Sequence, residues 1–194
     1  MIPRRIFLSA AFFAAVLSGT NAAIAADWDI DQLMQALAQV RSSHAAFSET
    51  KTVALLDKPQ LSSGELIYKA PDYFEKRTLR PQAETLILNG DTVLIARGQK
   101  HYLLKLADYP EIAAFTASLR GTLAGDRQLL QRSYALSLSG SQAHWTLQLL
   151  PTDSRIKERI ARILIRGVNN ELRSMEVIQT DGDRSITTIA SPTP

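Results

Sequence analysis

The chain has 194 residues and no cysteine, so the sequence excludes disulfide bonds and cysteine-bound metals. Its 22 basic and 19 acidic residues give a formal net charge of +3, and only +1 without Arg4 and Arg5 near the N-terminus. A balance this close to neutral gives little electrostatic support for binding nucleic acid.

The first 25 residues have the organisation of an export signal. Two arginines precede an apolar run over 6–17, and small residues follow up to the Ala23-Ile24-Ala25 pattern of a signal-peptidase site. A membrane anchor is the alternative, but the run is shorter than the roughly 20 residues that a spanning helix needs. We expect cleavage after Ala25 and export to the periplasm. Residues 26–194 should then form one domain, because they contain no long linker or repeat, and no cysteine is present to carry a lipid anchor.

The mature chain should open with an amphipathic helix and continue with strands. Asp29 and Gln32 form a capping box, and apolar residues recur at helical spacing up to Val40. The apolar period then changes to two, and Asn89-Gly90 is a hairpin signal between two of the runs. These runs predict strands near 44–56, 61–70, 73–80, 83–89, 91–97 and 100–106.

A helical pattern interrupts the strands after Asp108. Pro110 stands in the first turn, and the pattern continues past Gly125 to about Arg132. Strand character returns at 133–139, 143–150, 160–167, 171–179 and 184–190, with short turns between the runs. About eleven strands and three helices predict a mainly β fold: an open, strongly curved antiparallel sheet, or half-barrel, with an N-terminal helix and a helical lid over its concave side.

Bulky apolar side chains are concentrated in residues 61–95, where three strand runs follow one another closely. A strand face of this kind needs either a partner layer or a ligand to cover it. Trp145, Leu147 and Leu149 also alternate on one face, and core and cavity remain equally open readings for them.

Residues typical of catalysis or metal binding are not arranged in any familiar pattern. His44, His101 and His144 fall in different predicted strands with no ligand at metal-binding spacing, and we expect them to be partly exposed strand residues. The motifs of zinc proteases, serine hydrolases and P-loop proteins are missing, and Asp181-Gly182-Asp183 is best interpreted as a turn. We predict no catalytic residue, no metal and no cofactor.

A basic stretch lies at 155–166. Arg162 and Arg166 should lie on one strand face, with Ile163 and Ile165 on the other. The arginines could bind a lipid phosphate or an acidic partner, or could simply form a solvated strand face.

Several segments in order resemble the LolA family of periplasmic lipoprotein carriers. They are His44-Ala-Ala-Phe47-Ser-Glu49 after an amphipathic helix, then Gly64-Glu-Leu66, Pro71-Asp-Tyr-Phe74 and Glu84-Thr-Leu-Ile-Leu-Asn-Gly90. The resemblance spans most of the mature chain. It implies a curved sheet of about eleven strands with a helical lid, and a hydrophobic interior that shelters acyl chains without catalysis.

The implied protein is a periplasmic carrier of a lipoprotein or another amphiphilic lipid, with a donor complex at the inner membrane and an acceptor at the outer membrane. We expect a monomer. The expected cavity lining is Phe47, Leu66, Tyr68, Phe74, Leu86, Leu88, Leu147 and Leu149, and the expected lid residues are Ile112, Phe115 and Leu119.

Two departures from the family pattern bear on the cargo. An arginine thought to hold the lid shut precedes the matched proline in typical carriers, whereas this chain has Ala70 before Pro71. The F-x-F-x-P tail of those carriers has no counterpart after Ile189. The resemblance therefore implies a divergent branch whose cargo could be a glycolipid or an acylated pigment, with Lys76 and Arg77 suited to an anionic headgroup.

Two other classes of function remain open from the sequence. A lipid-sensing regulator of the same fold would contact an anti-sigma factor, although such regulators usually carry a second domain. A lipid hydrolase would need histidine and aspartate gathered in the cavity. A membrane-tethered acceptor is weaker than either, because it would need an acylated cysteine.

Overall fold

The eleven predicted strands form one antiparallel sheet in the computed structural model, which describes residues 28–191. The predicted export signal lies outside this range. The strands are β1 (Ser42–Thr52), β2 (Gln60–Lys69), β3 (Tyr73–Arg80), β4 (Glu84–Asn89), β5 (Thr92–Arg97), β6 (Lys100–Lys105), β7 (Tyr134–Ser141), β8 (His144–Pro151), β9 (Ile160–Val168), β10 (Glu171–Gln179) and β11 (Arg184–Ile189).

The first helix begins where the sequence predicts capping. The capping box of α1 (Ile30–Ala38) is present, with the Gln32 backbone N–H donating to Asp29 Oδ1 at 2.8 Å. The helical region after β6 consists of a 3₁₀ turn, η1 (Leu106–Asp108), then α2 (Pro110–Ala124) and α3 (Arg127–Gln131). One further short helix, α4 (Ser154–Lys157), lies between β8 and β9, where Asp153 caps it and Ile156 is buried.

The strand order departs from a simple meander in one pairing. The order is β6-β5-β4-β3-β2-β1-β11-β10-β9-β8-β7, so the first and last strands pair in the middle of the sheet. The two sheet edges are therefore β6 and β7, which are consecutive in the chain. The segment that joins them has to cross from one edge to the other, and it contains η1, α2 and α3.

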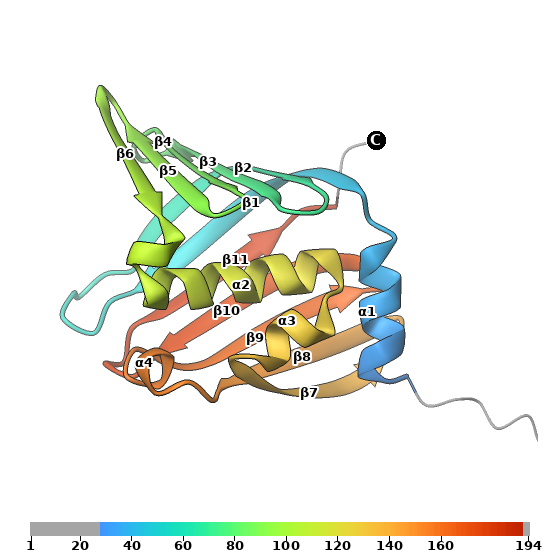
Figure 1. The fold of residues 1–194 in the computed structure, drawn as a ribbon. Helices are drawn as coiled ribbons and strands as arrows, with labels where there is room; N and C mark the ends of the chain where they lie inside the picture. The colour runs from blue at the N-terminus through green and yellow to red at the C-terminus, as the bar shows by residue number, and fades with distance from the viewer. Residues whose placement is uncertain (1–27, 192–194) are drawn as a thin grey trace, which may run out of the picture.

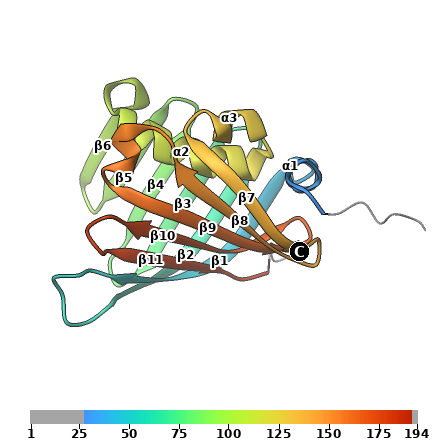
Figure 2. The same cartoon turned by 90° about the horizontal axis from the view of Figure 1, so that it is seen from below.

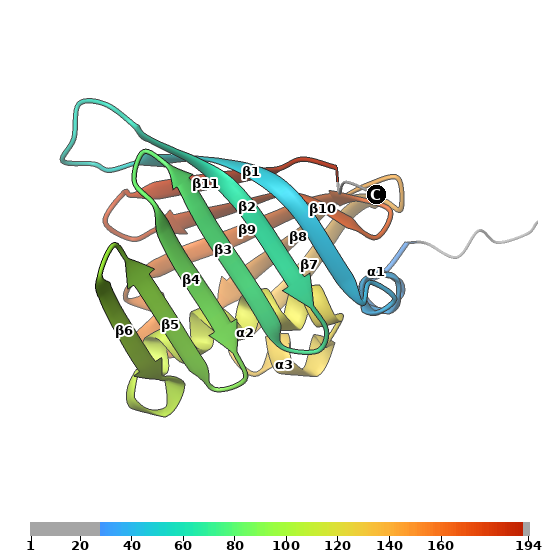
Figure 3. The ribbon, with the colours of Figure 1, turned by 90° about the horizontal axis from the view of Figure 1, so that it is seen from above.

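The crossing segment lies over the concave face of the sheet. Figure 1 shows α2 across the opening between the β1–β6 half and the β7–β11 half, with α1 upright at one end. The view from below shows α2 and α3 on one side of the sheet, and the view from above shows the strands β1–β6 passing in front of them (Figures 2 and 3). The predicted helical lid is therefore present, on the predicted side.

Two apolar clusters pack between the helices and the concave face. The larger cluster joins α1 and α3 to strands β7–β9, with Leu33, Leu130, Leu147 and Ile163 fully buried. The smaller cluster lies over β3–β6 and is centred on Leu88, Val93 and Leu106. Strands β7–β9 are therefore covered by a dense core, whereas strands β3–β6 are covered by a thinner one.

Candidate functional site

The residues expected to line a cavity all lie on the concave face. Opposite residues in antiparallel pairs share a face, and the register places Tyr68 opposite Phe74, and Phe74 opposite Leu88. The same rule places the other residues. Leu66 and Leu86 both lie opposite Lys76, and Phe47 lies opposite Gly64. Leu147 and Leu149 lie opposite Ile165 and Ile163.

These residues differ in how fully they are covered. Leu147 and Leu149 are fully buried in the larger cluster under α1 and α3, where they are packed core in this conformation. Leu66, Phe74 and Leu86 are half-buried, and the last two pack against the smaller cluster. Phe47, Tyr68 and Leu88 are buried. The smaller cluster has fewer buried members than the larger one, so space for a ligand is easier to create over β3–β6 than over β7–β9.

The lid helix α2 makes a mixed contact with the concave face. Of the expected lid residues, Phe115 packs on the larger cluster, Ile112 packs on the smaller one, and Leu119 is half-buried. Much of the buried side of α2 is instead made of hydroxyl residues, Thr116, Ser118 and Thr122, which donate back to carbonyls of their own helix. Small hydroxyl side chains bury little apolar area, so lifting α2 costs less than lifting a leucine-rich helix.

Arg120 of α2 is the polar tie between the lid and the sheet. Its Nη1 donates to the Gly90 carbonyl oxygen in the β4–β5 turn at 2.8 Å. Its Nε is buried and has no hydrogen-bond partner in the described part of the chain. The arginine that the family resemblance expects at position 70 is absent, but a lid-to-strand arginine contact exists here with the arginine on the helix.

A polar group sits on the same concave face, and we call it the concave polar cluster: Glu49, Ser62, Lys76, Ser185 and Thr187. Lys76 Nζ donates to Glu49 Oε2 at 2.6 Å, and Ser62 Oγ donates to the same oxygen at 3.1 Å. Ser185 Oγ and Thr187 Oγ1 donate to Glu49 Oε1 at 2.8 and 3.2 Å. The side chains of Glu49 and Lys76 are 20% and 26% exposed.

The electrostatics of this cluster favour an ionised carboxylate. Burial by itself raises the pKa of Glu49, but the hydrogen bond and charge of Lys76, with the hydroxyl donors, outweigh it and hold the pKa below its ordinary value. The Lys76 ammonium also lies 4.9 Å from the centre of the Phe47 ring, at the distance of a cation–π contact.

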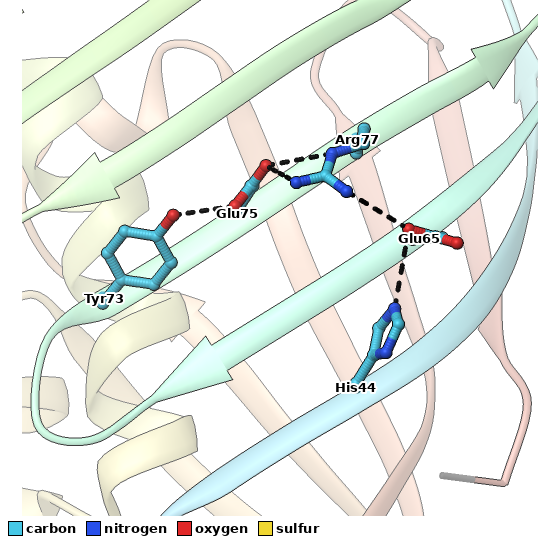
Figure 4. Close-up of polar contacts among 5 residues, drawn as sticks. All are labelled: His44, Glu65, Tyr73, Glu75 and Arg77. Atoms are coloured by element: carbon cyan, nitrogen blue, oxygen red, sulfur yellow. Dashed lines mark hydrogen bonds and ion pairs between the residues drawn. The ribbon is translucent and has the colours of Figure 1, made fainter. Parts of the chain in front are cut away.

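Arg77 lies on the opposite, convex face, because neighbouring residues of a strand point to opposite sides. It belongs to a chain of polar contacts across β1, β2 and β3 (Figure 4). Tyr73 Oη donates to Glu75 at 2.7 Å, Arg77 Nη2 donates to Glu75 at 2.6 Å, and Glu65 contacts both Arg77 and His44. Lys76 and Arg77 therefore cannot hold one headgroup together in this conformation.

Glu75 is buried at the centre of this convex chain, with 6% of its surface exposed. Burial by itself raises the pKa of Glu75. The hydrogen bonds from Tyr73 and Arg77 lower it by more, so the pKa is below its ordinary value. A second buried carboxylate of the convex face, Glu176, forms ion pairs with Arg166 and Arg184 at 3.1 and 2.8 Å. The two arginines of the basic stretch therefore differ. Arg166 is paired with the buried Glu176 carboxylate, whereas Arg162 is exposed.

The three histidines also lie on the convex face. His44, His101 and His144 are exposed and stand in β1, β6 and β8, on the side away from the helices. A hydrolase site with these histidines gathered inside the cavity is therefore wrong for this conformation, because strand alternation points them outward. Within residues 28–191, His, Asp and Glu side chains form no group of three that could hold a metal ion.

Two shallow hollows lie outside the sheet, beside α1. One of about 570 Å³ is lined by glutamines around Trp28, and one of about 380 Å³ lies between Trp28 and Arg127. Neither lies between α2 and the strands. Across residues 28–191, none of the helices combines the length and apolar character needed to cross a bilayer.

A curved sheet whose apolar face is closed by a crossing helical segment defines the class: the lipoprotein and lipid carrier fold. The chain belongs to the family described as outer membrane lipoprotein carrier protein LolA-like, whose pattern matches residues 21–193. No curated protein matches the sequence significantly.

The solved structures to which this chain is similar share little sequence with it. A LolA superfamily protein from Nitrosomonas europaea is 10% identical, with 86% of this chain and 93% of that chain covered and a TM-score of 0.44. The lipoprotein LppX from Mycobacterium tuberculosis is 12% identical, with 84% and 92% covered and a TM-score of 0.46. The Pseudomonas aeruginosa MucA/MucB complex contains a chain 14% identical, with 86% and 59% covered and a TM-score of 0.44.

Sequence reasoning missed two functional candidates, Glu49 and Arg120. Glu49 was noted only as part of a family segment, although a carboxylate among apolar residues at period two could have marked it as an inward-facing charge. Arg120 had a comparable signal, as a lone arginine within a helix of mostly small and apolar residues. Their partners, Lys76 and Gly90, could not be found without the strand register.

Proposed function

We propose that this protein is a periplasmic carrier that holds the acyl chains of a lipoprotein or another amphiphilic lipid between its concave face and α2, and moves them toward the outer membrane without catalysis. The observation that carries the proposal is the concave face itself: an apolar strand surface covered by a helix rich in hydroxyl side chains and tied to the sheet through Arg120. Membership in the LolA-like family supports it.

The driving force is the burial of hydrocarbon. A methylene transferred from water gains about 0.8 kcal/mol, so a sixteen-carbon chain represents on the order of 12 kcal/mol. In the present conformation the protein's own side chains occupy this face, so loading requires α2 to move away. We assign the acyl site to the β2–β6 side of the concave face, near Leu66, Tyr68, Phe74, Leu86 and Leu88, with Phe47 beside it on β1. We assign the lid to Ile112, Phe115 and Leu119.

Transport in this proposal needs partners that the chain does not supply. Residues 1–25 would direct export and be removed, which leaves 26–194 as one carrier domain. Net transfer then requires a donor at the inner membrane and an acceptor at the outer membrane with higher affinity for the cargo. We propose that the carrier itself is a monomer.

Uptake of a fluorescent fatty acid by protein purified from the periplasm tests the proposal. Leu86→Glu places a charge on the concave face over β4 and should abolish uptake, because the acyl chain would then have to desolvate a carboxylate. Leu94→Glu is the matched control, since Leu94 is a half-buried leucine of the neighbouring strand on the convex face, and it should keep uptake.

Mass spectrometry of the same purified protein is the second measurement, and extractable lipid is expected. The proposal is overturned if the wild-type protein carries no lipid and takes up no fatty acid. It is also overturned if Leu86→Glu and Leu94→Glu bind alike.

A further inference from the structure

The concave polar cluster occupies an unusual place for an ion pair. Glu49 follows Phe47 on the same face of β1, and Lys76 lies directly between Leu66 and Leu86 in neighbouring strands. A charged pair on an apolar face contributes little to stability compared with apolar side chains of similar size. Its position, next to the residues assigned to the acyl chain, points to a role in binding.

The hydrogen bonds of the cluster show which atoms remain available. A carboxylate can accept about four hydrogen bonds, and Glu49 already accepts four within the cluster. Lys76 has three N–H donors, and Glu49 is its one hydrogen-bond partner among residues 28–191. The hydroxyls of Ser62, Ser185 and Thr187 donate to Glu49, so their oxygens are left to accept.

The remaining donors of Lys76 and the hydroxyl oxygens indicate which kind of ligand the cluster could bind. Two N–H donors on a partly exposed ammonium suit an anionic oxygen, and the hydroxyl oxygens suit ligand hydroxyl groups beside it. Other cations lie on the same face toward the strand ends, namely Lys51, Arg97 and Lys100. Glu84 offsets one of them through its ion pair with Arg97. The excess of positive charge favours an anion over a cationic headgroup.

We propose that Lys76, oriented by Glu49, contacts a phosphate ester in the headgroup of the carried amphiphile, while the acyl chain lies over Leu66, Phe74 and Leu86. Ser62, Ser185 and Thr187 accept hydrogen bonds from hydroxyls next to the phosphate. This inference rests on the proposed carrier function and adds the chemical class of the cargo.

Calorimetric titration with two matched amphiphiles tests it. The probes are 1-lauroylglycerol 3-phosphate and 1-lauroylglycerol, which differ only in the phosphate, and inorganic phosphate is the third. The wild-type protein should bind the phosphate ester at least about ten-fold more tightly than the neutral ester, as expected for a charge-assisted hydrogen bond in a partly buried site. Inorganic phosphate should show no measurable binding.

Variants test whether the preference for the phosphate ester depends on Lys76. In the double variant Glu49→Gln with Lys76→Met, the ratio of the two affinities should fall to near one, because no uncompensated charge remains. Lys69→Met is the matched control: Lys69 also lies over an aromatic ring, Tyr73 at 5.8 Å, but on the convex face, and the wild-type ratio should persist. Should circular dichroism show that the double variant is unfolded, Lys76→Gln, which keeps a hydrogen bond to Glu49, takes its place.

The possible negative results distinguish failure of the carrier proposal from failure of the headgroup assignment. If the wild type binds neither ester, the carrier proposal fails together with this inference. If it binds both esters equally, or if the ratio survives the loss of Lys76, the carrier stands and the headgroup assignment is overturned. Binding of inorganic phosphate as tight as that of the ester would show a free-phosphate site instead and would likewise overturn it.

Discussion

Glu49 shows how one residue can be held as an ion on an apolar face. Its four hydrogen bonds come from β2, β3 and β11, so the carboxylate is stabilised only when all three strands are in register. The lowered pKa of Glu49 has a consequence for stability. A carboxyl whose pKa falls on folding stabilises the native state above its ordinary value of about 4.5, and that contribution is lost as the pH drops through the folded value.

Glu49→Gln should therefore lower the free energy of unfolding at pH 7, by about 1–3 kcal/mol, because Lys76 loses its charged partner. The gap between wild type and variant should narrow as the pH falls from 5 to 3. Urea unfolding at pH 7 and pH 3.5 measures it. A gap of the same size at both values would contradict the assignment of Glu49 as an ionised, paired carboxylate.

At the scale of elements, α2 is attached to its neighbours unequally. Its C-terminal end abuts α1: at Gly125, with φ of +66°, an added Cβ would stand 2.1 Å from the Met34 carbonyl oxygen. Its C-terminal half is also tied to the β4–β5 turn through Arg120. We therefore expect the C-terminal end of α2 to act as the fixed end of the lid and the N-terminal part, near Ile112, to move.

Arg120→Met should loosen the lid. Losing one partly buried, charge-assisted hydrogen bond should speed amide exchange along α2 by about ten-fold, while α1 stays protected. Hydrogen–deuterium exchange with mass spectrometry checks this. Arg127→Met is the control, since that arginine joins α3 to Asp31 of α1 at 2.6 Å instead of joining α2 to the β4–β5 turn. Unchanged exchange in α2 of the Arg120 variant would rule out the tie.

Gly125→Ala should destabilise the protein more than Gly98→Ala. Both glycines have positive φ, which costs an alanine about 1–2 kcal/mol, but an added Cβ at Gly98 meets nothing within 4 Å. The difference between the two variants measures the close approach of α1 and α2. Thermal unfolding is the readout, and equal losses in melting temperature would show that the contact can relax.

Across the whole molecule, the two sides of the sheet are packed differently. The β7–β9 half carries the dense cluster with α1 and α3, and the β3–β6 half carries the thin cluster under the N-terminal part of α2. A carrier needs one rigid region to keep its shape and another that can exchange its own side chains for a ligand. The unequal packing provides both in one continuous sheet.

Leu147→Ala should cost about 2–5 kcal/mol in the free energy of unfolding, because it opens a cavity in the fully buried cluster. Leu86→Ala should cost about half of that or less, since Leu86 is only half-buried. Equilibrium denaturation of both variants measures the contrast. If Leu86→Ala proves as damaging as Leu147→Ala, the β3–β6 half is as rigid as the other.

Much of the fold follows from local patterns. Period-two alternation located all eleven strands within a few residues, and the Asp29–Gln32 box located the start of α1. Alternation alone also places Lys76 and Arg77 on opposite faces of their strand, so the sequence already argues against a headgroup contact shared by both. The roles of the cavity and lid residues stay predictions, although their common face follows from the register.

What the sequence determined by itself was the eleven strands and the longer helices, because capping, turn chemistry and alternation act between residues a few positions apart. The tertiary structure decided which distant residues meet. The pairing of β1 with β11 brings Glu49 to Ser185, 136 positions away, and sends the α2 segment across the concave face to place Arg120 against Gly90. Such contacts depend on burying a whole strand face at once, and no local pattern encodes them.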